Sequence, residues 1–181
     1  MDHRARLTGK VTLMARRLSY SARFPFPADV FYDAYSTKEY WTEKMTDFRN
    51  LTPLSELTEF DVDDEGITVV QKQNLPHEYL PPIAQGVVKK DMIITREEFY
   101  GAWDGESSIG DYKASIPAGP GSLKGEASLF NTETGCTMRY TTVVKVFVPF
   151  VGTKLEQLIL INLVDLFRAE AEYLKYWVDK H

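Results

Sequence analysis

Residues 155–168 read Leu-Glu-Gln-Leu-Ile-Leu-Ile-Asn-Leu-Val-Asp-Leu-Phe-Arg, an almost wholly aliphatic stretch with a few polar side chains set into it. The stretch lies inside a long C-terminal helix, predicted over residues 151–179, which follows a strand that ends near Pro149. A helix that crosses a membrane needs about 20 consecutive apolar residues. The uninterrupted apolar run here is much shorter, and charged residues fill the following turns. We therefore expect no stable membrane insertion.

A projection of this helix at about 100° per residue separates a polar side from an apolar arc. The polar side carries Gln157, Asp165, Arg168, Glu172, Lys175 and Asp179. The apolar arc is wider than the stripe that a surface helix needs, yet it contains Asn162 and Glu170. Each of these two must find a partner or solvent, because an unpaired buried polar group is destabilising. The helix alone is compatible with a dry core and with a cavity.

The segments before the helix predict an antiparallel sheet. A strand at residues 17–24 precedes two short helices, one near Asp29–Tyr35 and one near Tyr40–Met45. Six further strands are predicted at residues 54–61, 67–73, 92–103, 107–116, 122–131 and 136–148, separated by turn signals. The proline-rich segment Leu75–Ile83 cannot join a regular ladder. The fold class is therefore α+β, with the long helix covering one face of the sheet.

Composition limits the possible functions. The chain has 181 residues, a net charge of -5 and one cysteine, which indicates one domain, no nucleic-acid surface and no internal disulfide. The three histidines and Cys136 form no local set of zinc ligands, so no metal is expected. Residues 1–16 lack the apolar core of a secretory signal. We interpret them as a mobile extension before a domain at residues 17–181, and we expect a cytoplasmic location.

Several motifs resemble those of a known superfamily. They are Phe24-Pro-Phe-Pro-Ala-Asp-Val-Phe31, Trp41 in the helix pair, Gly125, and Gly135-Cys-Thr-Met-Arg-Tyr140. Their order from about Arg17 to the C-terminus resembles the START-like (SRPBCC, birch-pollen-allergen-like) helix-grip superfamily. The segment Pro149-Phe-Val-Gly-Thr-Lys-Leu-Glu156 resembles an uncharacterised, mainly actinobacterial branch, a domain of unknown function. The resemblance implies a curved seven-stranded antiparallel sheet that grips the long helix around a hydrophobic cavity.

Members of the superfamily bind lipids, sterols, polyketides or plant hormones, and some are cyclases or hydrolases. Our leading hypothesis is therefore a non-enzymatic module that binds a hydrophobic small molecule or lipid without a cofactor. The residues expected to line its cavity are Tyr112, Met138 and Tyr140 on strands and Leu158, Ile159, Asn162, Leu166 and Tyr173 on the helix. Met138 and Tyr140 are placed inward because the opposite face carries Arg139 and Lys145. For residues 92–103, strand parity does not decide which face points inward.

Two alternatives remain open. A cyclase-, dehydratase- or hydrolase-like enzyme would use His77, or Tyr112 with Glu98, as its acid and base. A protein-interaction domain with a closed core would instead present an exposed apolar patch near Leu75–Ile83.

Overall fold

The computed structural model describes residues 16–50, 55–117 and 119–181. The predicted N-terminal extension therefore lies outside the described residues, apart from Arg16, which begins the first strand. The elements follow in the order β1 (Arg16–Phe24), α1 (Ala28–Tyr35), α2 (Lys38–Asp47), η1 (Phe48–Asn50), β2 (Glu56–Val62), β3 (Gly66–Leu75), η2 (His77–Tyr79), α3 (Pro82–Gln85), β4 (Met92–Gly101), β5 (Ser107–Ser115), β6 (Gly121–Thr132), β7 (Gly135–Val146) and α4 (Gly152–Lys180).

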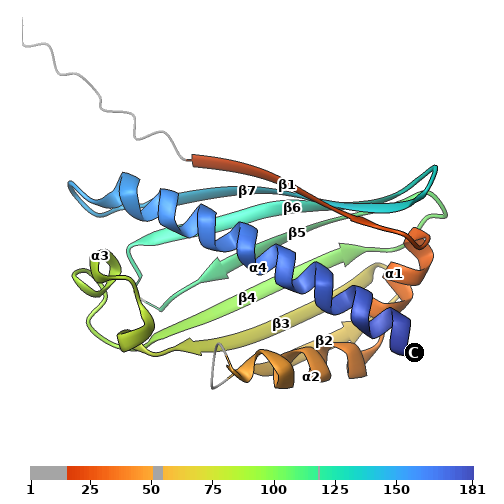
Figure 1. Cartoon of the computed structure of the whole chain (residues 1–181), viewed down its shortest axis with the longest axis horizontal. Helices are drawn as coiled ribbons and strands as arrows, with labels where there is room; N and C mark the ends of the chain where they lie inside the picture. Colours follow the sequence, from red (N-terminus) through yellow and green to blue (C-terminus); the bar gives the residue numbers. More distant parts are fainter. Residues whose placement is uncertain (1–15, 51–54, 118) are drawn as a thin grey trace, which may run out of the picture.

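All seven strands form one antiparallel sheet in the order β1-β7-β6-β5-β4-β3-β2. Strands β2 to β7 are a meander, and β1 closes the order by pairing with β7. The sheet is curved, and α4 crosses its concave face diagonally while α1 and α2 lie at one end (Figure 1). The predicted α+β helix-grip architecture is confirmed.

The junction between β1 and α1 is held by a hydrogen bond to a residue that lies far along the chain. Pro27 stands at the start of α1, where its missing N–H is of no consequence. The side chain of Asn131 on β6 accepts a hydrogen bond of 2.8 Å from the backbone N–H of Ala28. This contact satisfies one of the free donors at the start of the helix and ties it to the sheet.

The start of α4 is anchored by a buried carboxylate. Glu156 accepts a hydrogen bond of 3.0 Å from the backbone N–H of Val146 at the end of β7. Its other oxygen lies 3.7 Å from Nε of Arg16 at the start of β1. One side chain thus holds the first turns of α4 against two neighbouring strands. The predicted polar side of the helix is exposed along its whole length.

The inward faces of the strands agree with the sequence where parity was decisive. Tyr112, Met138 and Tyr140 are buried. On β4, for which parity left two possibilities, Arg96, Glu98 and Tyr100 are buried and point inward. The proline-rich segment forms η2 and α3, two helical turns that the sequence had not predicted. No helix within the described ranges is long and apolar enough to cross a membrane.

Candidate functional site

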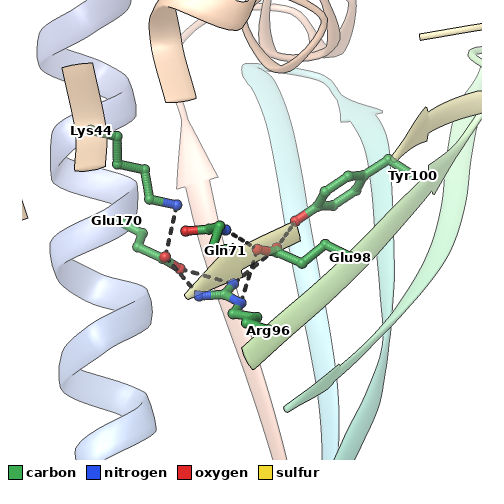
Figure 2. Close-up of polar contacts among 6 residues, drawn as sticks. All are labelled: Lys44, Gln71, Arg96, Glu98, Tyr100 and Glu170. Atoms are coloured by element: carbon green, nitrogen blue, oxygen red, sulfur yellow. Dashed lines mark hydrogen bonds and ion pairs between the residues drawn. The ribbon is translucent and has the colours of Figure 1, made fainter. Parts of the chain in front are cut away.

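Six polar side chains meet between the sheet and the second half of α4 (Figure 2). We call them the central cluster: Lys44 from α2, Gln71 from β3, Arg96, Glu98 and Tyr100 from β4, and Glu170 from α4. All six are buried. Three of them come together because alternate residues of β4 share one face, and Gln71 pairs directly opposite Arg96. Two cations face two carboxylates, so the cluster is formally neutral.

Arg96 lies between the two carboxylates. Its Nη1 and Nη2 donate to the two oxygens of Glu170 at 2.7 and 3.2 Å. Its Nη2 and Nε also contact the oxygens of Glu98, both at 3.0 Å. Lys44 reaches Oε1 of Glu170 at 2.8 Å, and its ammonium lies 4.6 Å from the ring centre of Trp41. Glu170, the charged residue inside the apolar arc, therefore finds its partners on α2 and β4.

Glu98 is enclosed on every side. Oε1 accepts from Nε2 of Gln71 and contacts Nε of Arg96, and Oε2 accepts from Nη2 of Arg96 and from the hydroxyl of Tyr100 at 2.5 Å. A carboxylate offers about four lone-pair positions, and these four contacts occupy them. In this arrangement Glu98 has no acceptor position left for a substrate proton.

Neighbouring charges keep Glu170 ionised. Burial alone would raise the pKa of Glu170, but the charges of Arg96 and Lys44 outweigh it and lower that pKa to about 2. Burial raises the pKa of Tyr100 well above its ordinary value, and the nearby Glu98 charge raises it further. Tyr100 therefore stays protonated and serves as a hydrogen-bond donor. Among the described residues the amide oxygen Oε1 of Gln71 is buried without a hydrogen-bond partner, whereas the charged groups are all paired. A network of paired charges of this kind is suited to holding α2, β4 and α4 together.

Four of the predicted ligand-binding residues, Tyr112, Met138, Tyr140 and Tyr173, are packed into the core. The ring of Tyr140 stacks on Phe167 of α4 at a centroid distance of 4.5 Å. The void lined by Met138, Tyr140 and Phe167 measures only about 10 Å³, roughly the space of one water molecule. This end of the helix-grip interior has no room for a ligand.

The other four predicted residues lie on the first half of α4 and are less enclosed. Leu158, Ile159 and Leu166 are half-buried, and Asn162 is exposed. Asn162 precedes Glu170 by eight residues and so lies about 80° around the helix from it. The structure thus places Asn162 at the edge of the inward side of α4, not beneath the helix.

Half-buried apolar side chains on the sheet accompany these helix residues. Ala114 on β5 pairs with Leu123 on β6, and both share the inward face with Arg96. We define the inner apolar surface as Leu163 and Leu166 of α4 together with Ile94, Ala114 and Leu123 of the sheet, all half-buried. The row formed by Thr142, Tyr112 and Glu98 separates this surface from the closed core.

The acid-base candidates are not brought together. His77 lies in η2, where its Nε2 is 3.4 Å from the carbonyl oxygen of Gln85. That turn follows the Leu75/Met92 end of the sheet, and Glu98 lies six residues further along β4, about 20 Å at the usual rise of a strand. Tyr112 pairs opposite Glu98, but its hydroxyl bonds to Oγ1 of Thr142 instead.

Comparison with known proteins identifies the family. A family described as "Protein of unknown function (DUF2505)" matches residues 19–178. The chain belongs to the DUF2505 family. An uncharacterized protein of Mycobacterium tuberculosis is 26% identical over 174 residues, which cover 91% of this DUF2505 chain and 98% of the relative.

Solved structures support the fold of this DUF2505 protein. A protein of Thermus thermophilus is similar with a TM-score of 0.57 and 14% identity, covering 88% of this chain and 97% of its own. Norcoclaurine synthase from Thalictrum flavum is similar with a TM-score of 0.54 and 16% identity, covering 99% and 95%. At these identities the likeness shows the helix-grip fold alone. The helix-grip fold implied by the START-like resemblance is confirmed, and so is the predicted domain of unknown function.

Sequence reasoning missed most of the central cluster in this DUF2505 chain. Glu170 stood out as a carboxylate in an apolar arc, but no pattern indicated that Lys44 and Gln71 would face it. Lys44 follows Trp41 and precedes Met45 and Phe48, all of which are buried. A lysine among buried apolar residues of a short helix was the available signal.

Proposed function

We propose that this protein binds a hydrophobic small molecule or lipid against the inner apolar surface, between the first half of α4 and the strands β4 to β6. One observation carries the proposal: apolar side chains on the inward sides of both helix and sheet stay half-exposed there, although the rest of the interface is packed. Ligand sites are commonly apolar surfaces of this kind with a few polar groups at hand.

The closed core supports this location and sets its limit. With a void of about 10 Å³ at the end of the interior lined by Met138 and Phe167, a ligand would enter only as far as the row of Tyr112 and Glu98. Arg96 and Glu98 are already paired with each other, so they offer no free charge to a ligand. The proposed ligand is therefore mainly apolar, with Asn162 at the rim as the nearest of the predicted polar contacts.

The two alternatives rank lower. An acid-base enzyme would need a free carboxylate or histidine beside the substrate, whereas Glu98 is fully bonded and His77 lies about 20 Å away along the sheet. An interaction domain acting through residues 75–83 would need several exposed apolar side chains there. In that segment Tyr79 is exposed while Leu80 is buried.

The proposal is tested with a substitution that fills the proposed binding space. Ala114→Trp would place a large ring on the inner apolar surface, while Ser115→Trp would place the same ring on the exposed opposite face of β5. Protein purified without detergent is examined by native mass spectrometry, and then titrated with a fluorescent fatty acid. We expect the wild type and Ser115→Trp to bind alike and Ala114→Trp to bind about tenfold or more weakly.

Two results would refute the proposal. One is the absence of any co-purified or added apolar ligand on the wild type. The other is equal binding by the two tryptophan variants, since a ligand at a different place would not respond to Ala114. Folding of both variants is checked by circular dichroism.

A further inference from the structure

The loop between β7 and α4 exposes large apolar side chains to solvent. Phe147 is exposed, and Phe150 at the tip is fully exposed. Phe150 also adopts φ 66°, a left-handed backbone conformation that bulky residues rarely take. Ile161 continues the apolar exposure along the outer side of α4. A fully exposed phenylalanine in a backbone conformation better suited to glycine or asparagine indicates a contact with something outside the chain.

Cationic side chains lie at the same end of the molecule as this loop. Lys145 lies with its Nζ 5.0 Å from the ring centre of Phe147. At this end of the strands and in its loops the cationic side chains include Arg17, Lys89, Lys90, Lys124, Lys145 and Lys154. The carboxylates at this end are Glu56, Glu59, Glu78, Asp91 and Glu97, the last paired with Lys113. The local balance is therefore basic, although the whole chain carries a net charge of -5.

The opposite end of the sheet has the opposite charge. Its three hairpin turns carry Asp63, Asp64, Glu65, Asp104, Glu106 and Glu133, and no lysine or arginine lies within these turns. The β7–α4 loop and the three hairpin turns lie at opposite ends of the sheet (Figure 1), so the molecule is electrically polarised along its strands. A field of this shape orients the protein with its loop of phenylalanines toward a negatively charged surface.

We propose that the β7–α4 loop docks on an anionic lipid bilayer, with Phe147 and Phe150 entering the boundary between headgroups and acyl chains and the lysines contacting lipid phosphates. Aromatic side chains beside cations are the combination that such an interface binds. Docking of this kind is peripheral and reversible, and it needs no helix that spans the membrane.

The geometry also connects docking with the proposed function. The first turns of α4 begin at this loop (Figure 1), and Leu163 and Leu166 of the inner apolar surface lie further along the same helix. A docked molecule would hold the first half of α4 next to the bilayer, so an apolar ligand could pass between membrane and protein without crossing much water. This transfer step rests on the proposed function, whereas the docking itself does not.

A second copy of the chain is the main competing occupant. A symmetric dimer through this loop would bring Lys145 and Lys154 of one copy against the same residues of the other. Like charges at an interface disfavour association. An anionic bilayer has the complementary charge, so the observations favour lipid.

The test is sedimentation of the full chain with lipid vesicles. Vesicles of phosphatidylcholine alone are compared with vesicles of phosphatidylcholine mixed with phosphatidylglycerol, at low and high salt. Phe150→Asn removes the apolar side chain and suits the left-handed backbone, so it should fold normally. Its control, Ile109→Asn, removes an exposed apolar residue on β5, near the acidic end. Lys154→Glu reverses one charge in the first turn of α4, where a carboxylate favours the helix.

We expect binding to the anionic vesicles that weakens with salt. Phe150→Asn should bind about tenfold more weakly and Lys154→Glu roughly fivefold or more, while Ile109→Asn binds like the wild type. Phe150→Trp should show blue-shifted emission that brominated lipids quench. The proposal is overturned if the wild type does not sediment with anionic vesicles, or if Phe150→Asn binds them equally well. It is also overturned if the wild type forms a dimer in solution, does not bind vesicles, and loses that dimer on the Phe150→Asn substitution. Apolar ligand binding in solution, measured without vesicles, decides the proposed function separately.

Discussion

Removal of the Glu170 charge should destabilise the protein more than any exposed charge change. Glu170→Gln keeps the size of the side chain but leaves two buried cations, Lys44 and Arg96, with one carboxylate, Glu98, which contacts Arg96. One buried cation is then left without a matching anion, which is strongly unfavourable because little water is present in the interior to solvate it.

The magnitude follows from the pKa of Glu170. Although burial opposes ionisation, Arg96 and Lys44 lower that pKa from 4.5 to about 2. At about 1.36 kcal/mol per pKa unit, the ionised form stabilises the fold by roughly 3 kcal/mol. For a domain of this length that corresponds to a decrease in melting temperature of about 6–12 °C. The control Asp165→Asn breaks an exposed ion pair with Arg168 at 3.2 Å and should change stability by about 0.5 kcal/mol or less.

The effect has a defined pH dependence. The folded-state pKa lies below the unfolded-state pKa, so the contribution of Glu170 is fully present above about pH 5 and is lost as pH falls toward 2. The difference in stability between wild type and Glu170→Gln should therefore decrease from roughly 3 kcal/mol at pH 7 to about 1.4 kcal/mol at pH 3. A loss of stability in acid that occurs in the wild type but not in the variant reports protonation of the Glu170 carboxylate.

The assay is urea unfolding followed by tryptophan fluorescence, since Trp41 and Trp177 are buried in the same core. A loss below about 1 kcal/mol at pH 7, or a difference that does not change with pH, would refute the account of the central cluster as an ionised network.

Two substitutions and one chemical modification test other parts of the structure. Gly125→Ala should lower stability by about 1–3 kcal/mol in thermal unfolding, because a Cβ there would lie 2.5 Å from the Tyr112 ring; an unchanged melting temperature would contradict this packing. Glu156→Ala should cost about 1–3 kcal/mol and speed hydrogen exchange at Val146, whose N–H donates to that carboxylate at 3.0 Å; unchanged exchange would contradict the anchor. Burial raises the pKa of the Cys136 thiol to about 12, so a disulfide reagent at pH 8 should modify it only after unfolding, and rapid native-state reaction would count against its burial.

The central cluster also gives the closed end of the interior a defined geometry, which apolar packing alone would not. Its six side chains come from four elements, and each bond orients two of them. An apolar replacement of the whole set could be equally stable, as buried ion pairs seldom add net stability. Their directional bonds instead fix how α2 and α4 sit on β4.

The order of elements could be read from the sequence because it depends on local patterns. Asp-Gly turns, strand alternation and the apolar arc of residues 155–168 each reflect neighbouring residues, and they predicted every strand and the long helix. Tyr112, Met138 and Tyr140 were placed inward correctly for the same reason. On β4 the pattern was ambiguous because its inward face carries Arg96 and Glu98, charged residues that only a partner on another element makes acceptable.

The local patterns of the sequence therefore predicted the order of strands and helices and the polar outer side of α4, and the family resemblance implied the helix-grip arrangement. Only the tertiary structure decided that Glu170 meets Lys44 and Arg96, that Asn162 lies at an edge, and that the interior is closed at one end and half-exposed at the other. These features depend on the diagonal crossing of α4 over the curved sheet. That crossing brings together residues as distant in sequence as Arg96 and Glu170, and local periodicity carries no information about such pairs.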